Sequence, residues 1–122
     1  MLDGLNILLV EDDVLILLDL KASLENAGAH VTTASSLRDA LKYCEADYAA
    51  AILDIRLPDG EVFPAAERLA QARIPIIFHS GNAGCDSARA RFPDAAALSK
   101  PVQEQVLIAT VQQKAKSTAR IN

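Results

Sequence analysis

Five short apolar runs alternate along the chain with segments of helical periodicity. The runs cover residues 6–10, 30–34, 48–53, 74–79 and 95–99, and the helical segments cover residues 14–27, 37–46, 62–72, 85–92 and 102–116. This alternation predicts βαβ units, in which helices connect parallel strands of one sheet. We therefore expect a doubly wound α/β protein in which residues 1–122 form one domain. Residues 114–122 are polar, and we expect them to fray at the end of the last helix.

The composition argues against several functional classes. A formal net charge of −4 disfavours a protein that holds nucleic acid through its charge. Cys44 and Cys85 form neither a C-x-x-C motif nor a zinc-ligand spacing, so we expect two free thiols in a reducing compartment. Asp3 and Gly4 stand where a secretory signal would be basic, and no apolar run approaches the ~20 residues of a membrane span. We expect a cytoplasmic protein that contacts neither nucleic acid nor membrane.

Polar side chains suited to phosphate and metal chemistry follow four of the five apolar runs. Glu11 and Asp12 follow the first run, Asp54 the third, Ser80 the fourth and Lys100 the fifth. In an open parallel sheet these positions meet at the carboxyl edge, where such folds bind their ligands. Carboxylates at the ends of buried strands are costly unless their charge is used. Together these residues predict a site for a hard cation and a phosphoryl group.

Each of these residues also has a plainer interpretation when it is taken singly. The acidic pair could form a solvated turn at the start of the first helix, where negative charge is favourable. Asp54 could simply end a strand, and Ser80 stands before a glycine in what could be an ordinary turn. Asp13 fits best as the N-cap of the first helix. His30 and His79 lie in or beside strands, and we expect them to have structural roles in the core or at an edge.

Several short motifs, taken in order, resemble a known family. They are Val10-Glu11-Asp12-Asp13, Asp54 with Leu57-Pro58 after it, Ser80-Gly81 and Lys100-Pro101. Together they resemble the receiver domain of two-component response regulators, and the resemblance covers essentially the whole chain. It implies a flavodoxin-like sheet of five parallel strands in the order 2-1-3-4-5.

The resemblance also implies how a phosphoryl group would be held. Asp54 corresponds to the phosphoacceptor, whose carboxylate attacks phosphorus to give an acyl phosphate. Lys100 corresponds to the lysine that reaches the phosphoryl oxygens, and Ser80 to the hydroxyl that hydrogen-bonds the group once it has formed. In relatives the bond that corresponds to Lys100–Pro101 is cis.

A magnesium site is implied by the same resemblance. Glu11, Asp12, Asp54 and the backbone carbonyl of Arg56 correspond to the residues that hold Mg²⁺, a hard cation that takes oxygen ligands and keeps several waters. Asp12 is the better direct ligand, with Glu11 acting through water. The side chains of Arg56 and Asn82 occupy positions that influence the lifetime of the phosphoryl group in this family.

As a receiver, the chain would accept a phosphoryl group from a histidine kinase or a histidine phosphotransfer protein. We expect a stand-alone phosphoacceptor that signals by protein contact and is not a turnover enzyme. The first helix begins with consecutive apolar residues, more than one core face requires. Val14, Leu15 and Leu18 lie beside the acidic pair, where receivers dock the phosphoryl donor, so the resemblance implies a docking face there. The alternative is that these side chains pack under a neighbouring loop. One alternative is an interaction module that works without phosphorylation. Another is a Mg²⁺-dependent aspartyl-phosphate hydrolase, but Arg56 stands where such enzymes carry a second acid.

Two departures from the family pattern bear on activation. Ala97 stands where many receivers carry an aromatic residue that rotates inward. Residues 81–94 leave room only for a helix over 85–92, about 12 Å long, which is shorter than a typical strand of ~17–20 Å. Residues 60–64 and 78–82 resemble the single-domain receivers called FATGUY regulators, although His79 and Asn82 depart from that motif. We therefore expect a shortened or mobile fourth helix, and activation through ordering of residues 81–94.

Overall fold

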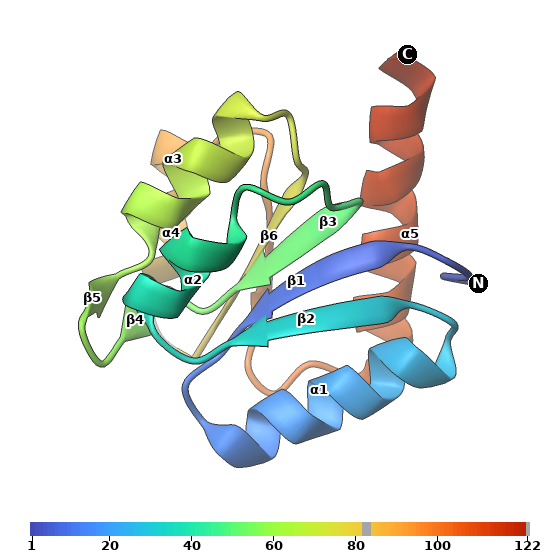
Figure 1. Ribbon diagram of the computed structural model, residues 1–122, viewed down its shortest axis with the longest axis horizontal. Coiled ribbons are helices and arrows are strands. Elements are labelled where there is room, and N and C mark those ends of the chain that lie inside the picture. The colour runs from blue at the N-terminus through green and yellow to red at the C-terminus, as the bar shows by residue number, and fades with distance from the viewer. Residues whose placement is uncertain (82–83, 122) are drawn as a thin grey trace.

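The computed structural model describes residues 1–81 and 84–121. Its elements are β1 (Asn6–Val10), α1 (Val14–Asn26), β2 (His30–Ala34), α2 (Leu37–Tyr43), β3 (Ala50–Leu53), β4 (Arg56–Leu57), β5 (Gly60–Glu61), α3 (Phe63–Gln71), β6 (Ile76–Ser80), α4 (Gly84–Arg91), β7 (Ala96–Ser99) and α5 (Glu104–Ile121) (Figure 1). The main sheet has five parallel strands in the order β2-β1-β3-β6-β7. This confirms the expected α/β class and strand order.

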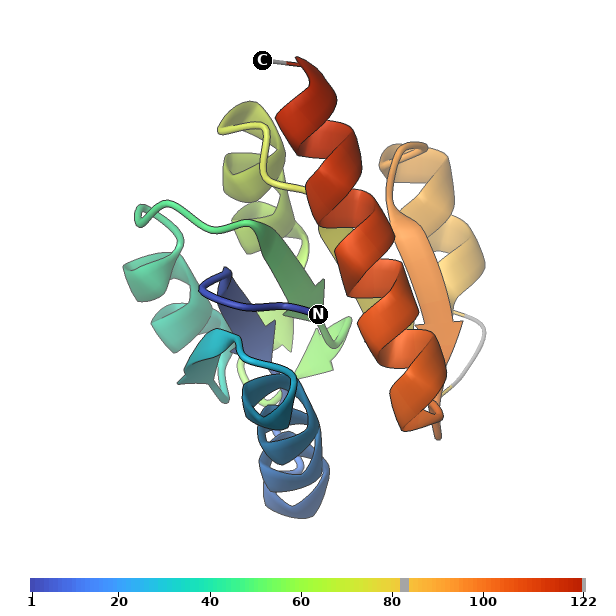
Figure 2. The ribbon, with the colours of Figure 1, turned by 90° about the vertical axis from the view of Figure 1, so that its right-hand side faces the viewer.

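Helices cover both faces of this sheet, so its central strands read as continuous apolar runs. Helices α1 and α5 lie on one face, where Leu24, Ile52 and Leu107 belong to one core cluster (Figure 2). Helices α2, α3 and α4 lie on the other face over a second cluster that includes Leu53 and Phe78. Every residue of β3 is buried, as expected for the centre of a doubly wound sheet.

Local sequence features define the helix ends, and Asp13 caps the first helix as predicted. Asp13 Oδ1 accepts hydrogen bonds from the N–H groups of Leu15 at 3.0 Å and Ile16 at 3.3 Å, which makes Asp13 the N-cap of α1. Gly28, just past α1, has a φ of +104°, a value that favours glycine. At the start of α2, the Ser36 hydroxyl oxygen accepts a hydrogen bond from the Asp39 N–H at 3.1 Å.

The shortened fourth helix is present as expected. α4 has eight residues, Gly84–Arg91, and the next residue, Phe92, contacts the rings of Phe63 and Phe78 with centroids 6.2 Å and 5.7 Å away. Residues 82 and 83 lie outside the described residues, so Asn82 is not placed. The ordering of residues 81–94 on activation stays a prediction.

Several element bounds differ from the sequence-based expectation; for example, β3 begins at Ala50 and α5 at Glu104, each two residues later than expected. The second helix ends at Tyr43 instead of continuing to residue 46. α5 is helical as far as Ile121, five residues beyond the expected end at residue 116, and the fraying expected from Lys114 stays a prediction. The turn after Asp54 is closed by a small antiparallel hairpin of β4 and β5, whose two-residue strands are too short to show periodicity. None of the helices within the described part of the chain is long and apolar enough to span a membrane.

Candidate functional site

Backbone hydrogen bonds bring the carboxyl ends of β1, β3, β6 and β7 together. The Asp54 N–H donates to the Val10 carbonyl at 2.9 Å, and the Lys100 N–H donates to the Ser80 carbonyl at 3.1 Å. These bonds extend the parallel ladders one residue past the strands, so the residues that follow four separate strands become neighbours. The parallel register therefore assembles the site that the sequence predicted at this edge.

Three carboxylates gather there. Glu11, Asp12 and Asp54 each offer an oxygen atom, and these atoms all lie within 4.8 Å of one another. Glu11 and Asp54 are buried, with 1% and 7% of their surface exposed, whereas Asp12 is exposed. Buried carboxylates this close to each other are unfavourable unless positive charge lies between or beside them.

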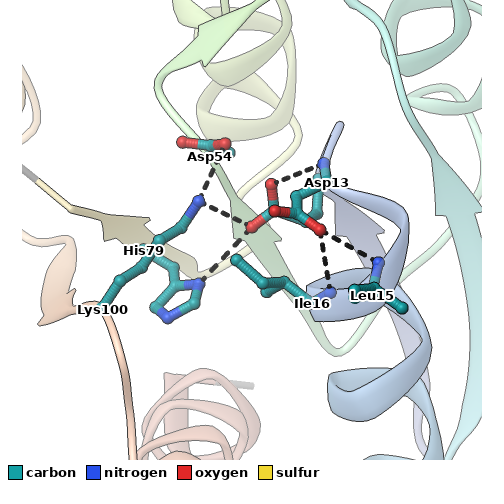
Figure 3. A network of polar contacts seen from close by, with 7 residues as sticks. Asp13, Leu15, Ile16, Asp54, His79 and Lys100 are labelled. Atoms are coloured by element: carbon teal, nitrogen blue, oxygen red, sulfur yellow. Dashed lines mark hydrogen bonds and ion pairs between the residues drawn. The ribbon is translucent and has the colours of Figure 1, made fainter.

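Lys100 supplies part of that positive charge. Its Nζ lies 2.8 Å from Glu11 Oε1 and donates a hydrogen bond to Asp54 Oδ2 at 3.1 Å. Figure 3 shows the lysine extending to Asp54, with the His79 ring beside its side chain. Burial lowers the pKa of Lys100, but the hydrogen bonds and charges of Glu11 and Asp54 outweigh burial and raise it. The ammonium group is therefore held charged between two carboxylates, and the Lys100–Pro101 bond is cis, as the resemblance implied.

One ammonium group does not balance the three carboxylates. Burial, followed by the neighbouring Glu11 carboxyl group, raises the pKa of Asp54 above its usual range despite the opposing effect of Lys100. A divalent cation bound among these oxygens would neutralise the remaining negative charge. Carboxylate oxygens at a partly open edge are also the ligand type that Mg²⁺ prefers. The donor set therefore fits a magnesium ion.

Ser80 and Arg56 lie where the sequence analysis expected them. Ser80 is the last residue of β6, and Arg56 is the first residue of β4, two positions after Asp54. Ser80 is buried and pairs with Ser99 of β7. The Arg56 side chain is exposed, and its backbone lies in β4 opposite Glu61. Because the Val62 N–H donates to the Ile55 carbonyl at 2.9 Å, the next pair of the hairpin, Arg56 with Glu61, occupies a non-hydrogen-bonded position. The Arg56 carbonyl is therefore not used within the hairpin.

His79 is buried in β6 as the sequence analysis expected, but its neighbours were not predicted. It was expected in the core or at an edge without a chemical partner, but its Nδ1 lies 4.0 Å from Glu11 Oε1, and the side chain is buried. It also lines a cavity of about 300 Å³ with Ile16, Asp19, Leu20, Lys100, Pro101 and Val102. Burial and the Lys100 charge lower the pKa of His79 to about 4, so the imidazole is neutral at pH 7. The sequence did contain a signal for this position. Successive side chains of a strand point to opposite faces of the sheet, so His79 and Ser80 had to lie on opposite faces at the same end of the strand.

Comparisons with known proteins agree with this geometry. The response regulator receiver domain profile matches residues 7–112. The chain belongs to this family. Its sequence is 28% identical to a CheY-like receiver domain protein from Methanospirillum hungatei, with a TM-score of 0.88 and coverage of 98% of this chain and 100% of that one. It is 29% identical to a receiver protein from Sinorhizobium medicae, with a TM-score of 0.87 and coverage of 97% of this chain and 99% of that one. A comparison with curated proteins found no match.

A third solved structure bears on the metal. The receiver domain of a sensor histidine kinase from Pseudomonas aeruginosa is 27% identical to this receiver, with a TM-score of 0.80 and coverage of 93% of this chain and 98% of that one. That structure has a magnesium ion coordinated in its active-site cleft. In the present receiver, the acidic cluster of Glu11, Asp12 and Asp54 occupies the carboxyl edge of the sheet.

An apolar patch lies next to this cluster on α1. Val14, Leu15 and Leu18 expose 60%, 76% and 56% of their surface. Helix α1 buries its other side through Leu20 and Leu24, so these three side chains are not needed for the core. Exposed apolar side chains grouped in this way make α1 a candidate binding surface.

Proposed function

We propose that this receiver accepts a phosphoryl group on Asp54 from a phosphohistidine of a histidine kinase or phosphotransfer protein and then signals through protein contact. Lys100 supports this proposal most strongly, because its Nζ hydrogen-bonds Asp54 Oδ2 at 3.1 Å inside a cluster of three carboxylates. A partly buried, charged lysine on a carboxylate suits an attack on phosphorus, since the nucleophile and the phosphoryl group are both anionic and the lysine offsets their repulsion.

Each residue would then have a defined role. An Asp54 carboxylate oxygen attacks phosphorus, the bond from phosphorus to the donor's histidine nitrogen breaks, and an acyl phosphate forms. Lys100 would move from the Asp54 carboxylate to a phosphoryl oxygen, and the Ser80 hydroxyl would donate to another. Mg²⁺, held by Asp12, Asp54 and the Arg56 carbonyl with Glu11 acting through water, would supply positive charge at the reacting oxygens.

The two alternatives have less support. A module that works without phosphorylation does not need the Lys100–Asp54 contact, which places two ionisable groups in a partly buried position. A hydrolase would need a second acid beyond Asp54, and the side chain two residues on is the exposed Arg56. The short α4 supports a place among the FATGUY type of receiver.

Phosphorylation by a small donor tests the proposal directly. Incubation of the protein with acetyl phosphate and Mg²⁺ should add the mass of one phosphoryl group, measured by intact-protein mass spectrometry. The same incubation with EDTA should add none, because the three carboxylates would repel the donor without the cation. A protein that gains no mass at any Mg²⁺ concentration would contradict the proposed function.

The α1 patch should be the docking face for the protein donor. Leu15→Glu or Leu18→Glu should slow transfer from the donor protein about tenfold, the equivalent of roughly 1.4 kcal/mol of lost docking energy. Labelling by acetyl phosphate should remain unchanged, because both side chains are exposed and neither belongs to the carboxylate cluster. Rates from both donors can be measured by rapid quench.

Tyr43→Glu provides the matched control, since Tyr43 is a partly exposed apolar residue on α2, on the opposite face of the sheet. It should leave both rates unchanged. Equal slowing with both donors for Leu15→Glu would show damage to the fold instead of to docking.

A further inference from the structure

The hairpin that follows Asp54 is tied to a helix from a much earlier part of the chain. At the tip of the hairpin, Asp59 Oδ1 accepts a hydrogen bond from the Leu37 N–H at 2.7 Å, and Oδ2 accepts one from the Arg38 N–H at 2.9 Å. Leu37 and Arg38 are the first two residues of α2, and β4 and β5 lie beside that helix (Figure 1). One carboxylate therefore joins the hairpin to the N-terminus of α2 with both of its oxygens.

This contact is close and specific. Gly60, the next residue, has a φ of +142°, and a Cβ atom there would lie 3.3 Å from Leu37 Cδ2. The Arg38 and Leu37 N–H groups lower the pKa of Asp59, so the carboxylate stays charged at the positive end of the helix. α2 has a separate cap of its own in Ser36, which accepts from the Asp39 N–H. Asp59 is thus an addition to the capping of α2, and it comes from the hairpin.

The other end of the hairpin lies at the acidic cluster. The Asp54 N–H donates to the Val10 carbonyl, and the Val62 N–H closes the hairpin on the Ile55 carbonyl. Arg56 follows Ile55 as the first residue of β4, and its pair with Glu61 is a non-hydrogen-bonded pair, which leaves its carbonyl out of the hairpin ladder. The position of this peptide therefore depends on the position of the hairpin, and Asp59 ties the tip of the hairpin to α2 through two hydrogen bonds.

We propose that Asp59 is a positioning residue for the metal site, which it serves by anchoring the hairpin to α2 and so fixing the Arg56 backbone in β4, two residues after Asp54 of the carboxylate cluster. This inference rests on the proposed function, in which the Arg56 carbonyl is a ligand to Mg²⁺. Side chains that orient metal ligands without touching the metal contribute about tenfold or more to affinity. Loss of the anchor should therefore weaken Mg²⁺ binding while the carboxylate ligands remain in place.

Mg²⁺ binding can be measured without phosphorylation by titrating ¹⁵N-labelled protein and following the amide signals of residues 11–12 and 54–56. Asp59→Ala should raise the dissociation constant for Mg²⁺ about tenfold. Asp59→Asn should fall between it and the wild type, since the amide oxygen can accept only one of the two hydrogen bonds. The asparagine variant also provides a folded protein if the alanine variant is unstable.

Two matched controls distinguish the loss of the Asp59 hydrogen bonds to α2 from the loss of a helix cap or of a negative charge. Ser36→Ala removes the other cap from the same helix, and Glu61→Gln removes a negative charge from the same hairpin. Both should bind Mg²⁺ within about twofold of the wild type, because neither touches the anchor.

Wild-type affinity in Asp59→Ala and Asp59→Asn would overturn the inference, as would an equal loss in Ser36→Ala or in Glu61→Gln. Mg²⁺ binding by the wild-type protein with no effect of Asp59 would leave the proposed function intact. Absence of Mg²⁺ binding by the wild type would instead contradict both.

Discussion

Asp54→Asn should abolish phosphoryl transfer from acetyl phosphate and from a protein donor alike. Asparagine has nearly the shape of aspartate, but its neutral amide lacks the nucleophilic oxygen that would attack phosphorus. The variant should also lose one of the two carboxylate partners of Lys100, whose Nζ lies 3.1 Å from Asp54 Oδ2 and 2.8 Å from Glu11 Oε1. Intact-protein mass spectrometry should show no added phosphoryl group at any time point. A hydroxylamine-labile phosphoryl group that persists in this variant would show that another carboxylate is the acceptor.

Substitutions at two neighbouring aspartates distinguish loss of the metal site from damage to the fold. Asp12→Ala should also fail to gain mass, since it removes an exposed member of the carboxylate cluster. Asp13→Asn is the matched control. Asparagine caps helices about as well as aspartate, so α1 should begin at the same residue and labelling should proceed. Loss of labelling in Asp13→Asn would indicate that the whole acidic turn, and not Asp12 in particular, is required.

His79 should make the protein lose stability as the pH falls from about 6.5 to about 4. Burial and the Lys100 charge lower the pKa of His79 from 6.5 to about 4 in the folded protein. Between these values the unfolded chain binds a proton that the folded protein does not, so unfolding becomes more favourable as the pH falls. The contribution is fully present above pH 6.5 and amounts to about 3 kcal/mol at most.

His79→Gln isolates this contribution. The wild type and the variant share the other ionisable groups of the site, Asp54, Glu11 and Lys100. The raised pKa of Asp54 favours the folded protein as the pH falls, but it does so in both proteins. The difference between the two unfolding curves therefore reports the contribution of His79. Urea unfolding at pH 7 and at pH 4.5 should show a smaller loss of stability in the variant by about 2 kcal/mol. His30→Gln, at the exposed start of β2, controls for the removal of a histidine. Parallel pH dependence in His79→Gln and the wild type would contradict the prediction.

The sequence was sufficient for the sheet because its signals are local. Buried parallel strands are short apolar runs, and the helices between them have their own periodicity and caps, as at Asp13 and Ser36. The candidate site could be predicted for a related reason. Once the strands are parallel, the residues just past them, such as Asp54 and Lys100, must meet at one edge. No knowledge of side-chain packing was needed for either conclusion.

Other features depend on contacts that no local pattern records. His79 has the same sequence signature as a core residue of β6, and only the packing of β6 beside Lys100 puts its ring near Glu11. Asp59 stands in an ordinary turn signal, but the N–H groups that it binds belong to residues 21 and 22 positions earlier in the chain. The five strands of the main sheet, their direction and the residues at their ends could thus be predicted, because they follow from periodicity and topology. The side chains that surround the carboxylates, and the contact that anchors the hairpin of β4 and β5, became visible in the folded protein alone, because those contacts join segments that are far apart in the sequence.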